Sequence, residues 1–277
     1  MCDTCGCNIT DANKDLLEPG GKHEKTSTGH ESIEVLQNLL HENNHTAAHN
    51  REHFDKHQVL AINLMSSPGS GKTSLLEATI DALKNELSIA VIEGDLETEN
   101  DAQRIRDKQV PAIQIQTGSA CHLDAHMTHQ ALHDLDLEKF DIVFIENVGN
   151  LVCPASFDLG HHLNVTLLSV TEGDDKPAKY PVMFRGSNLH LISKSDLLPY
   201  LDDFKVEDAE QNIRNLANPS PILKISAKKN EGISDWINWL KGQLELHRKL
   251  LAQGQTLMPK IQSEGARLHQ HSHEHSH

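Results

Sequence analysis

The chain has 277 residues, of which 25 are Lys or Arg, 40 are Asp or Glu and 20 are His, so its formal net charge is −15 with neutral histidine. Such an acidic chain is a poor candidate for nonspecific binding to nucleic acid, which needs clustered Lys and Arg. It contains no run of about 18 apolar residues that would span a membrane. Its first residues lack the basic and apolar regions of a secretory signal. These features predict a cytoplasmic protein that binds neither nucleic acid nor a membrane.

Residues 1–30 are predicted to be a flexible, cysteine-rich arm, because they contain a Pro-Gly-Gly segment and almost no apolar periodicity. Three of the first seven residues are cysteines, namely Cys2, Cys5 and Cys7. Thiolates at this density suit a thiophilic or borderline ion such as Ni²⁺ or Zn²⁺. A redox Cys-x-x-Cys pair is the alternative, but such a pair normally begins a helix in a βαβ unit, and that context is missing here.

Residues 31–57 are predicted to be a helix that carries a row of histidines. Their spacing of four places neighbouring imidazoles next to each other on a helix. The row is either a solvated helix face or a device for accessory metal capture, and spacing alone does not decide between them. Its members are His41, His45, His49, His53 and His57.

Residues 58–252 alternate between short apolar runs and amphipathic stretches, which predicts an α/β domain with a mostly parallel sheet flanked by helices. The predicted strands are 59–65, 89–93, 112–116, 142–145, 165–170, 189–193 and 221–225. The predicted helices of this domain are 72–87, 122–135, 206–216 and 233–251. Residues 253–277 are polar, and their alternating histidines predict a tail with weak, multivalent affinity for Ni²⁺ or Zn²⁺.

The strongest motif is the loop Ser66-Ser67-Pro68-Gly69-Ser70-Gly71-Lys72-Thr73, between a predicted strand and a predicted helix. Glycines let backbone N–H groups converge on phosphates, Lys72 reaches the β- and γ-phosphates, and Thr73 holds Mg²⁺. The strict phosphate-binding pattern has Gly where this chain has Ser66, and the alternative is an ordinary Gly-rich turn. The predicted nucleotide contacts of the loop are Gly69, Ser70, Gly71, Lys72, Thr73 and Ser74.

Two acids end later predicted strands, Asp95 and Glu146, and Gly149 follows the second. We predict that both acids act on the magnesium ion or its water and that the Gly149 N–H contacts the γ-phosphate. The predicted catalytic residues are therefore Lys72, Thr73, Asp95 and Glu146. Taken alone, either acid is equally compatible with a helix cap or a surface position.

The choice of base rests on two weaker motifs. The segment Ser193-Lys194-Ser195-Asp196 resembles the guanine-reading Asn-Lys-x-Asp motif of GTPases, with Ser193 in place of the usual Asn. Asp196 would accept both guanine N–H donors while the stem of Lys194 packs on the ring. The segment Ser226-Ala227-Lys228 resembles the complementary loop. Either segment alone would pass for a polar loop, but together and in this order they favour GTP over ATP.

Cys121 and His122 open the predicted helix 122–135, and Cys153 follows Gly149 by a few residues. Both places are ones where a GTPase changes shape with its γ-phosphate, so a metal held by these three residues would respond to nucleotide. A symmetric dimer would supply further ligands. Two structural thiols and a capping imidazole are the alternative. We interpret His126, His129 and His133, farther along this helix, as solvated surface rather than ligands.

Four segments together resemble the HypB family of hydrogenase nickel-incorporation GTPases, which belong to the SIMIBI class of P-loop proteins. They are Cys2-x-x-Cys5-Gly6-Cys7, the loop 66–73, Ala120-Cys121-His122 with the following Leu-Asp, and the segment 146–155 that ends Cys153-Pro-Ala. The resemblance implies a GTPase that uses GTP/GDP and Mg²⁺ and dimerises on GTP binding. It also implies nickel delivery to the [NiFe]-hydrogenase large subunit with a HypA-type accessory protein as partner. We expect the intrinsic turnover of the GTPase to be slow, because no arginine finger or catalytic glutamine is recognised in the sequence.

The same resemblance assigns the metal ligands. It implies high-affinity nickel at Cys2, Cys5 and Cys7, and a second Ni²⁺ or Zn²⁺ site at Cys121, His122 and Cys153. Three other functions stay open at this point: a related nickel GTPase for urease, an ATP-dependent P-loop kinase, and a non-enzymatic nickel or zinc store.

Overall fold

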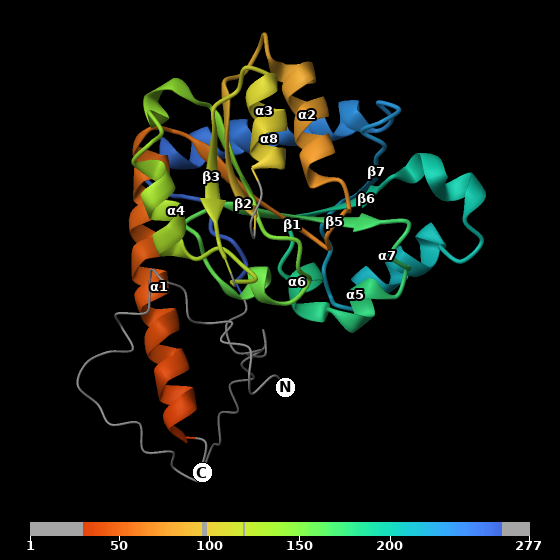
Figure 1. Cartoon of the computed structure of the whole chain (residues 1–277), viewed down its shortest axis with the longest axis horizontal. Coiled ribbons are helices and arrows are strands. Elements are labelled where there is room, and N and C mark those ends of the chain that lie inside the picture. The colour runs from red at the N-terminus through yellow and green to blue at the C-terminus, as the bar shows by residue number, and fades with distance from the viewer. Residues whose placement is uncertain (1–29, 96–98, 119, 262–277) are drawn as a thin grey trace.

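The computed structural model describes residues 30–95, 99–118 and 120–261, with side chains from residue 40 onward (Figure 1). The predicted metal ligands Cys2, Cys5 and Cys7 and the tail histidines lie outside the described residues. Seven strands form one sheet in the order β3-β2-β4-β1-β5-β6-β7, and every neighbouring pair is parallel. The predicted fold class is therefore confirmed. The strands are β1 (Leu60–Ser66), β2 (Ile89–Asp95), β3 (Ala112–Gln116), β4 (Ile142–Glu146), β5 (Leu163–Ser169), β6 (Leu189–Ser193) and β7 (Ile222–Lys224).

Most of the helices lie in the connections between consecutive strands. They are α1 (His30–Lys56), α2 (Lys72–Leu83), α3 (Asn100–Asp107), α4 (Ala125–Leu132), α5 (Lys176–Lys179), α6 (Pro181–Arg185), α7 (Val206–Arg214) and α8 (Ile233–Leu251). Three short 3₁₀ turns complete the described elements, η2 (Leu137–Lys139), η3 (Cys153–Ser156) and η4 (Ser195–Tyr200). No helix in the described part of the chain is both long enough and apolar enough to cross a membrane.

One expected boundary is wrong in a way that bears on function. Cys121 and His122 do not begin a helix, because α4 starts at Ala125. Asp124 is its N-cap, and the Asp124 carboxylate accepts a hydrogen bond from the Met127 N–H at 2.8 Å. Cys121 and His122 therefore lie in the loop that leads from β3 to α4.

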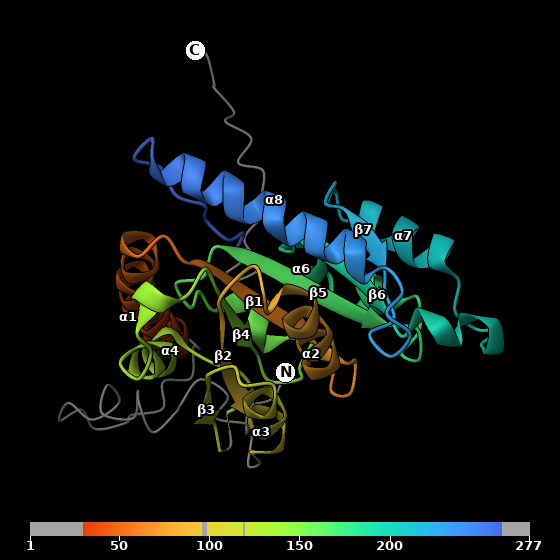
Figure 2. The ribbon, with the colours of Figure 1, turned by 90° about the horizontal axis from the view of Figure 1, so that it is seen from above.

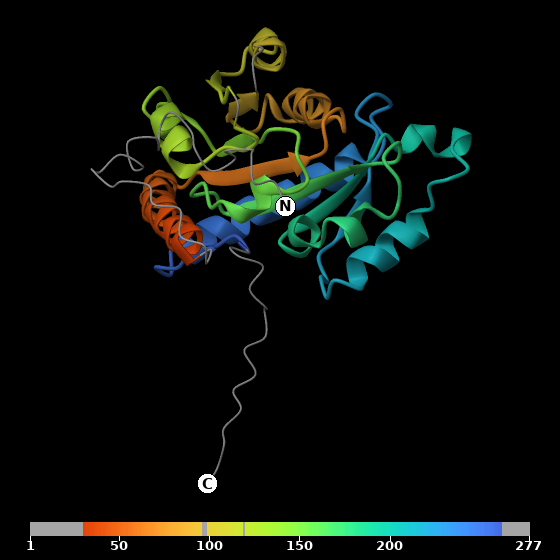
Figure 3. The same cartoon turned by 60° about the horizontal axis from the view of Figure 1, so that its bottom comes forward.

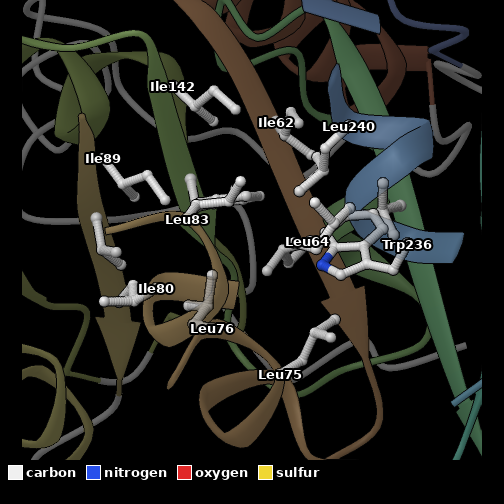
Figure 4. Close-up of a cluster of buried hydrophobic side chains, with 14 of the residues drawn as sticks. Ile62, Leu64, Leu75, Leu76, Ile80, Leu83, Ile89, Ile142, Trp236 and Leu240 are labelled. Atoms are coloured by element: carbon white, nitrogen blue, oxygen red, sulfur yellow. The ribbon is translucent and has the colours of Figure 1, made fainter. Parts of the chain in front are cut away.

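Helices cover both faces of the sheet (Figure 2). Helices α2, α3 and α8 pack on one face, while α1 and α4 cover the β2–β4 part of the other face and α6 and α7 cover the part near β6. Figure 4 shows the first of these contacts, where Trp236 of α8 lies beside Leu64 of β1 and the leucines of α2. The Trp236 indole N–H donates to the Thr79 hydroxyl at 2.8 Å, which ties α8 to α2.

Helix α1 lies directly beside α4, as Figures 1 and 3 show. Fully buried Asn50 donates from its amide to the carbonyl oxygens of Ala125 and Leu159 at 2.8 and 3.1 Å. Arg51 forms a buried ion pair with Asp158 at 2.6 Å. A Cβ at Gly160 would lie 2.4 Å from the Asn50 Cβ. Only glycine therefore allows the loop to approach α1 this closely. The predicted histidine helix is therefore packed against the nucleotide-binding domain.

The C-terminal end of the described chain also returns to α1. Thr256 donates to Asp55 at 2.9 Å, and Asp55 accepts from the His162 Nε2 at 3.0 Å. Because the His162 Nδ1 accepts from the Ala61 N–H at 2.9 Å, the ring proton must lie on Nε2. The nitrogen facing Asp55 thus has no lone pair for a metal ion, so this group, with His247 beside it, is a structural junction.

Buried histidines give the fold a defined response to acid. Burial lowers the pKa of His190 to about 4, with Arg214 and Lys260 acting in the same direction. A histidine whose folded-state pKa lies below its unfolded value of about 6.5 contributes stability above that value, and this stability is lost as pH falls towards 4. Between pH 7 and pH 5 the free energy of unfolding should fall by about 2 kcal/mol through His190 alone.

Urea unfolding of wild type and of His190→Leu at the two pH values measures this contribution. The variant should be less stable at pH 7, because the Phe184 carbonyl loses the hydrogen bond from His190 (2.9 Å) and keeps the one from the Asn218 amide (2.7 Å). Its further loss between pH 7 and pH 5 should nevertheless be smaller than that of wild type. Equal losses in the two proteins would show that His190 is not the titrating group.

Candidate functional site

The predicted phosphate loop connects the end of β1 to α2. Gly69 and Gly71 have φ angles of 72° and 97°, in the left-handed region that favours glycine. A Cβ at either position would meet no atom within 4 Å, so the requirement for glycine is conformational and the space above the loop stays open. The Lys72 ammonium donates to the Ser66 hydroxyl at 3.2 Å. The residue that departs from the strict motif, Ser66, therefore accepts a hydrogen bond from the lysine that we predict to contact the phosphates.

A residue that the sequence did not indicate also contacts this loop. The Glu172 carboxylate accepts hydrogen bonds from the hydroxyls of Ser67, at 2.7 Å, and of Ser70. Glu172 lies about one hundred positions away in the chain, just after β5, and no local motif marks it. Its carboxylate orients two hydroxyls of the loop.

Buried acids lie next to the loop. The Thr73 hydroxyl donates to the Glu146 Oε1 at 2.9 Å, while the Glu146 Oε2 is buried without a hydrogen-bond partner. Glu93 is the register partner of Glu146 on the neighbouring strand, and its Oε2 is likewise buried and unpartnered. Oxygens of Glu93, Glu146 and Asp101 lie within 4.8 Å of one another. Burial, followed by the charges of Glu146, Asp95 and Asp101, raises the pKa of Glu93 to about 8.

This donor set fits a hard divalent cation. The group consists of a hydroxyl and carboxylate oxygens, which Mg²⁺ prefers over nitrogen or sulfur ligands. Burial also raises the pKa of Glu146, whereas Lys72 and Thr73 act in the opposite direction. With the pKa of Glu93 at about 8, a proton on Glu93 relieves the repulsion between the two buried carboxyl groups at neutral pH, and a bound cation would replace that proton.

The acid that the sequence assigned to β2 was Asp95, whereas the group around Thr73 contains Glu93. Strand alternation places both on the same face, but only Glu93 is opposite Glu146 in the β2–β4 register. Asp95 lies at the partly exposed end of β2, and its role in magnesium binding stays a prediction. Asp101 was not predicted, because the short polar helix α3 that carries it has only two buried residues, Ala102 and Ile105.

The predicted base-binding segments line one cavity of about 240 Å³ beside the loop. The Ser193 hydroxyl donates to the Ser70 carbonyl at 2.7 Å, so the residue that replaces the usual Asn connects the base-binding segment to the phosphate loop. Lys194 has a φ of 57°, which turns the chain sharply after β6. The predicted residues that line this cavity are Ser70, Gly71, Ser74, Lys194, Asp196, Ser226, Ala227 and Lys228.

The structure brings together Cys121, His122 and Cys153, whose ligand atoms all lie within 4.8 Å of one another. The two sulfurs are 3.1 Å apart, well beyond the S–S bond of about 2.05 Å in a disulfide. The Cys121 sulfur is 3.7 Å from the His122 Nδ1. Burial lowers the pKa of His122 to about 4, and its ring stacks on Phe157 with centroids 4.0 Å apart. A neutral, stacked imidazole beside two thiols is a suitable donor set for a borderline metal ion.

The segment that follows β4 contacts both the phosphate loop and the cysteine–histidine group. A Cβ on Gly149 would lie 2.7 Å from the Pro68 Cα, so the two backbones meet with no room for a side chain. The Asn147 side chain accepts from the Leu123 N–H at 3.2 Å, and the Asn150 side chain donates to the Cys121 carbonyl at 3.3 Å. Residues 146–153 therefore form a continuous connection between the two sites.

Comparison with known proteins agrees with this arrangement. The model of the CobW/HypB/UreG nucleotide-binding domain matches residues 60–224. The hydrogenase maturation factor HypB of Escherichia coli K12 is 50% identical over 223 residues, which cover 80% of this chain and 77% of that protein. The chain belongs to the HypB family of hydrogenase maturation factors. HypB of Azotobacter vinelandii is 48% identical over 225 residues, covering 81% of this chain and 74% of that protein.

A solved structure extends the match to the architecture. The crystal structure of HypB from Helicobacter pylori in complex with nickel has a TM-score of 0.71 and 43% sequence identity to this chain. The match covers 74% of this chain and 96% of that one. These relatives favour the hydrogenase assignment for this HypB-family chain over the urease alternative, and they confirm its nucleotide-binding domain.

The contact between Gly149 and Pro68 yields a direct test of the nucleotide site. We expect Gly149→Ala to weaken GDP binding at least tenfold, because the new methyl group must displace the phosphate loop backbone. Gly242→Ala is the matched control, since Gly242 lies in α8 with no atom within 4 Å of its Cβ position. The control should bind GDP normally and gain about 0.5–1 kcal/mol of stability. Calorimetric titration with GDP measures the first effect, and unchanged affinity in Gly149→Ala would contradict the tight contact.

Proposed function

We propose that this chain is a GTPase that binds nickel at Cys121, His122 and Cys153 and passes it on during maturation of a [NiFe]-hydrogenase. The observation that carries the proposal is the segment 146–153, which contacts both the phosphate loop and the cysteine–histidine group. A nucleotide can change the affinity for a metal only if the two sites share a structural element that differs between nucleotide states. Residues 146–153 contact both sites, and in this proposal their position differs between the nucleotide states.

In the nucleotide site, the backbone N–H groups of the loop Gly69–Thr73 hold the phosphates and Lys72 neutralises their charge. Thr73 and Glu146 would hold Mg²⁺, with Glu93 and Asp101 beside them, and Asp95 would act at the edge of the site. The ion, when bound, supplies the charge that offsets the terminal phosphate oxygens. The Gly149 N–H contacts the γ-phosphate in this proposal, which is supported by the close approach of the Gly149 backbone to Pro68. We expect slow intrinsic hydrolysis, since no arginine finger or catalytic glutamine is assigned.

Guanine occupies the cavity between Lys194, Asp196 and Ser226. Asp196 accepts from the two guanine N–H donors, a pairing that adenine does not offer. Ser193 supports this site by its hydrogen bond to the Ser70 carbonyl, which fixes the base-binding segment relative to the phosphates. The base site and the phosphate site are thereby held at a constant separation.

In the metal site, the cysteine–histidine group takes Ni²⁺ as cargo, and Zn²⁺ suits the same ligands. It offers three ligands, so a second copy of the chain or a HypA-type accessory protein would complete the coordination. Val152, next to Cys153, is an exposed apolar residue (57%), as expected at an interface. We infer that two chains pair here when GTP is bound, and that the metal then passes towards the hydrogenase large subunit. Cys2, Cys5 and Cys7 stay the predicted high-affinity nickel ligands.

Nickel affinity in two nucleotide states tests this function. Wild type should hydrolyse GTP in preference to ATP, and its Ni²⁺ affinity at Cys121, His122 and Cys153 should differ at least fivefold between GDP and a non-hydrolysable GTP analogue. Lys72→Ala should lose GTP turnover and the nucleotide dependence of nickel affinity. GTP turnover and Ni²⁺ affinity are measured for each protein in a background with Cys2, Cys5 and Cys7 changed to Ser. Equal nickel affinity in the two states would refute the coupling, and normal turnover in Lys72→Ala would refute the nucleotide mechanism.

The base assignment has its own test. An Asn at position 196 would present one donor and one acceptor, which matches the O2 and N1–H of xanthine but not the two donors of guanine. Asp196→Asn should therefore bind GDP at least a hundredfold more weakly and xanthosine diphosphate more tightly than wild type does. Asp202→Asn, on an exposed loop beyond the cavity, is the control and should leave both affinities unchanged. If Asp196→Asn still prefers GDP, this side chain does not read the base.

A further inference from the structure

The packing of α1 against α4 brings together two histidine pairs that the sequence places in separate segments. His49 and His53 are one helical turn apart on α1, and His129 of α4 is one turn before His133, which caps the C-terminal end of that helix. The ring centroids of His49 and His53 are 4.6 Å apart, and those of His129 and His133 are 4.8 Å apart. Across the two helices, the rings of His49 and His129 are 5.2 Å apart.

These separations are those of imidazoles around one metal ion. A metal–nitrogen bond of about 2.1 Å places the centre of a ligating imidazole roughly 3 Å from the ion. Two neighbouring ligands then have ring centres roughly 4.5–5 Å apart, and two opposite ligands roughly 6 Å apart. Of the other cross-helix pairs, His53 and His129 have centroids 6.2 Å apart, whereas His133 is in ring contact with His129 alone among the described histidines. The rings now stand edge to face, so rotation of the exposed His49 and His133 side chains is needed to turn their nitrogens inward.

One ring of the four is already oriented as a ligand. The His129 Nδ1 lies 2.9 Å from the Asn50 Oδ1. Because the buried Asn50 amide nitrogen donates to the Ala125 and Leu159 carbonyls, its oxygen must accept, and the His129 Nδ1 carries the proton. The Nε2 lone pair of His129 then points away from the core. A hydrogen bond to the far nitrogen is how proteins commonly orient a metal-binding histidine.

The surroundings keep these rings in the ligating form. Burial, together with the neighbouring histidines, lowers the pKa of His53 and of His129. Lys56 and His57 act on His53 in the same direction, and His126 acts on His129. A lowered pKa favours the neutral imidazole at His53 and His129, and a neutral imidazole is the species that binds Zn²⁺, Ni²⁺ or Cu²⁺.

We propose that His49, His53, His129 and His133 form an interhelical binding site for a divalent transition-metal ion. The site shares no residue with the cysteine–histidine group, and it uses histidines that we interpreted from sequence as surface or left undecided. A bound ion would join α1 to α4, the helix whose N-terminal end follows Cys121 and His122. Metal at this site therefore stabilises the docking of α1 beside the segment that carries the other metal ligands.

Zn²⁺ titration of the full-length chain tests the proposal in a background in which all five cysteines are changed to Ser. His49→Ala/His133→Ala removes one exposed ligand from each helix and leaves the buried contacts of Asn50 and Phe54 intact. This variant should bind one equivalent of Zn²⁺ at least tenfold more weakly than the parent, measured by competition with a chromogenic chelator. Its rise in Tm on adding saturating Zn²⁺ should shrink accordingly.

The chain offers a matched control on the same helix. His41 and His45 are exposed members of the α1 row, and no ring contact links them to α4 among the described residues. His41→Ala/His45→Ala should leave the Zn²⁺ affinity and the Tm shift at the parent values. The single variants His49→Ala and His133→Ala should each weaken the same equivalent, because the site spans both helices. Equal losses in the two double variants, or no loss in His49→Ala/His133→Ala, would overturn the interhelical site.

Discussion

The contact between Gly149 and Pro68 is the constraint on which the arrangement of the two sites depends. Strand β4 pairs with β1 on one side and with β2 on the other. Its carboxyl end therefore lies beside the phosphate loop, and the residues that follow it cross that loop. The backbones are too close for a Cβ, which means that neither can move far without the other. Close-packed contacts of this kind respond by switching between arrangements rather than by yielding gradually.

The same strand end carries the electrostatic strain of the site. Glu93 and Glu146 are forced side by side by the β2–β4 register, and each has a buried oxygen without a partner. Lys72 offsets part of this charge at Glu146 and is itself held by Ser66. An arrangement of this kind is unfavourable for folding alone and becomes favourable when a cation binds. In our proposal, the local loss of stability is exchanged for affinity for the cation.

The sequence predicted the sheet well because parallel strands buried on both faces read as continuous apolar runs, as in β1 and β4. The phosphate loop was predictable because its chemistry is local, confined to the loop 66–73. Glu93 and Glu172 were missed for the opposite reason: strand register selects the first, and a contact between distant segments places the second. The start of α4 was misplaced because the apolar pattern does not reveal the Asp124 cap. In the same way, helical periodicity showed which histidines adjoin within α1 but not that α1 packs on α4.

The positions of the histidines in the fold change the charge that the composition alone would suggest. Twenty histidines suggest a charge that changes strongly near pH 6.5. Among the residues that the structure describes, five are buried with a lowered pKa, namely His122, His161, His162, His190 and His247. Since His53 and His129 are also shifted downward, these rings remain neutral at a pH where exposed imidazoles would already be charged. The folded protein therefore keeps more of its negative charge in mild acid than its composition implies, and it keeps neutral imidazoles available to metal ions.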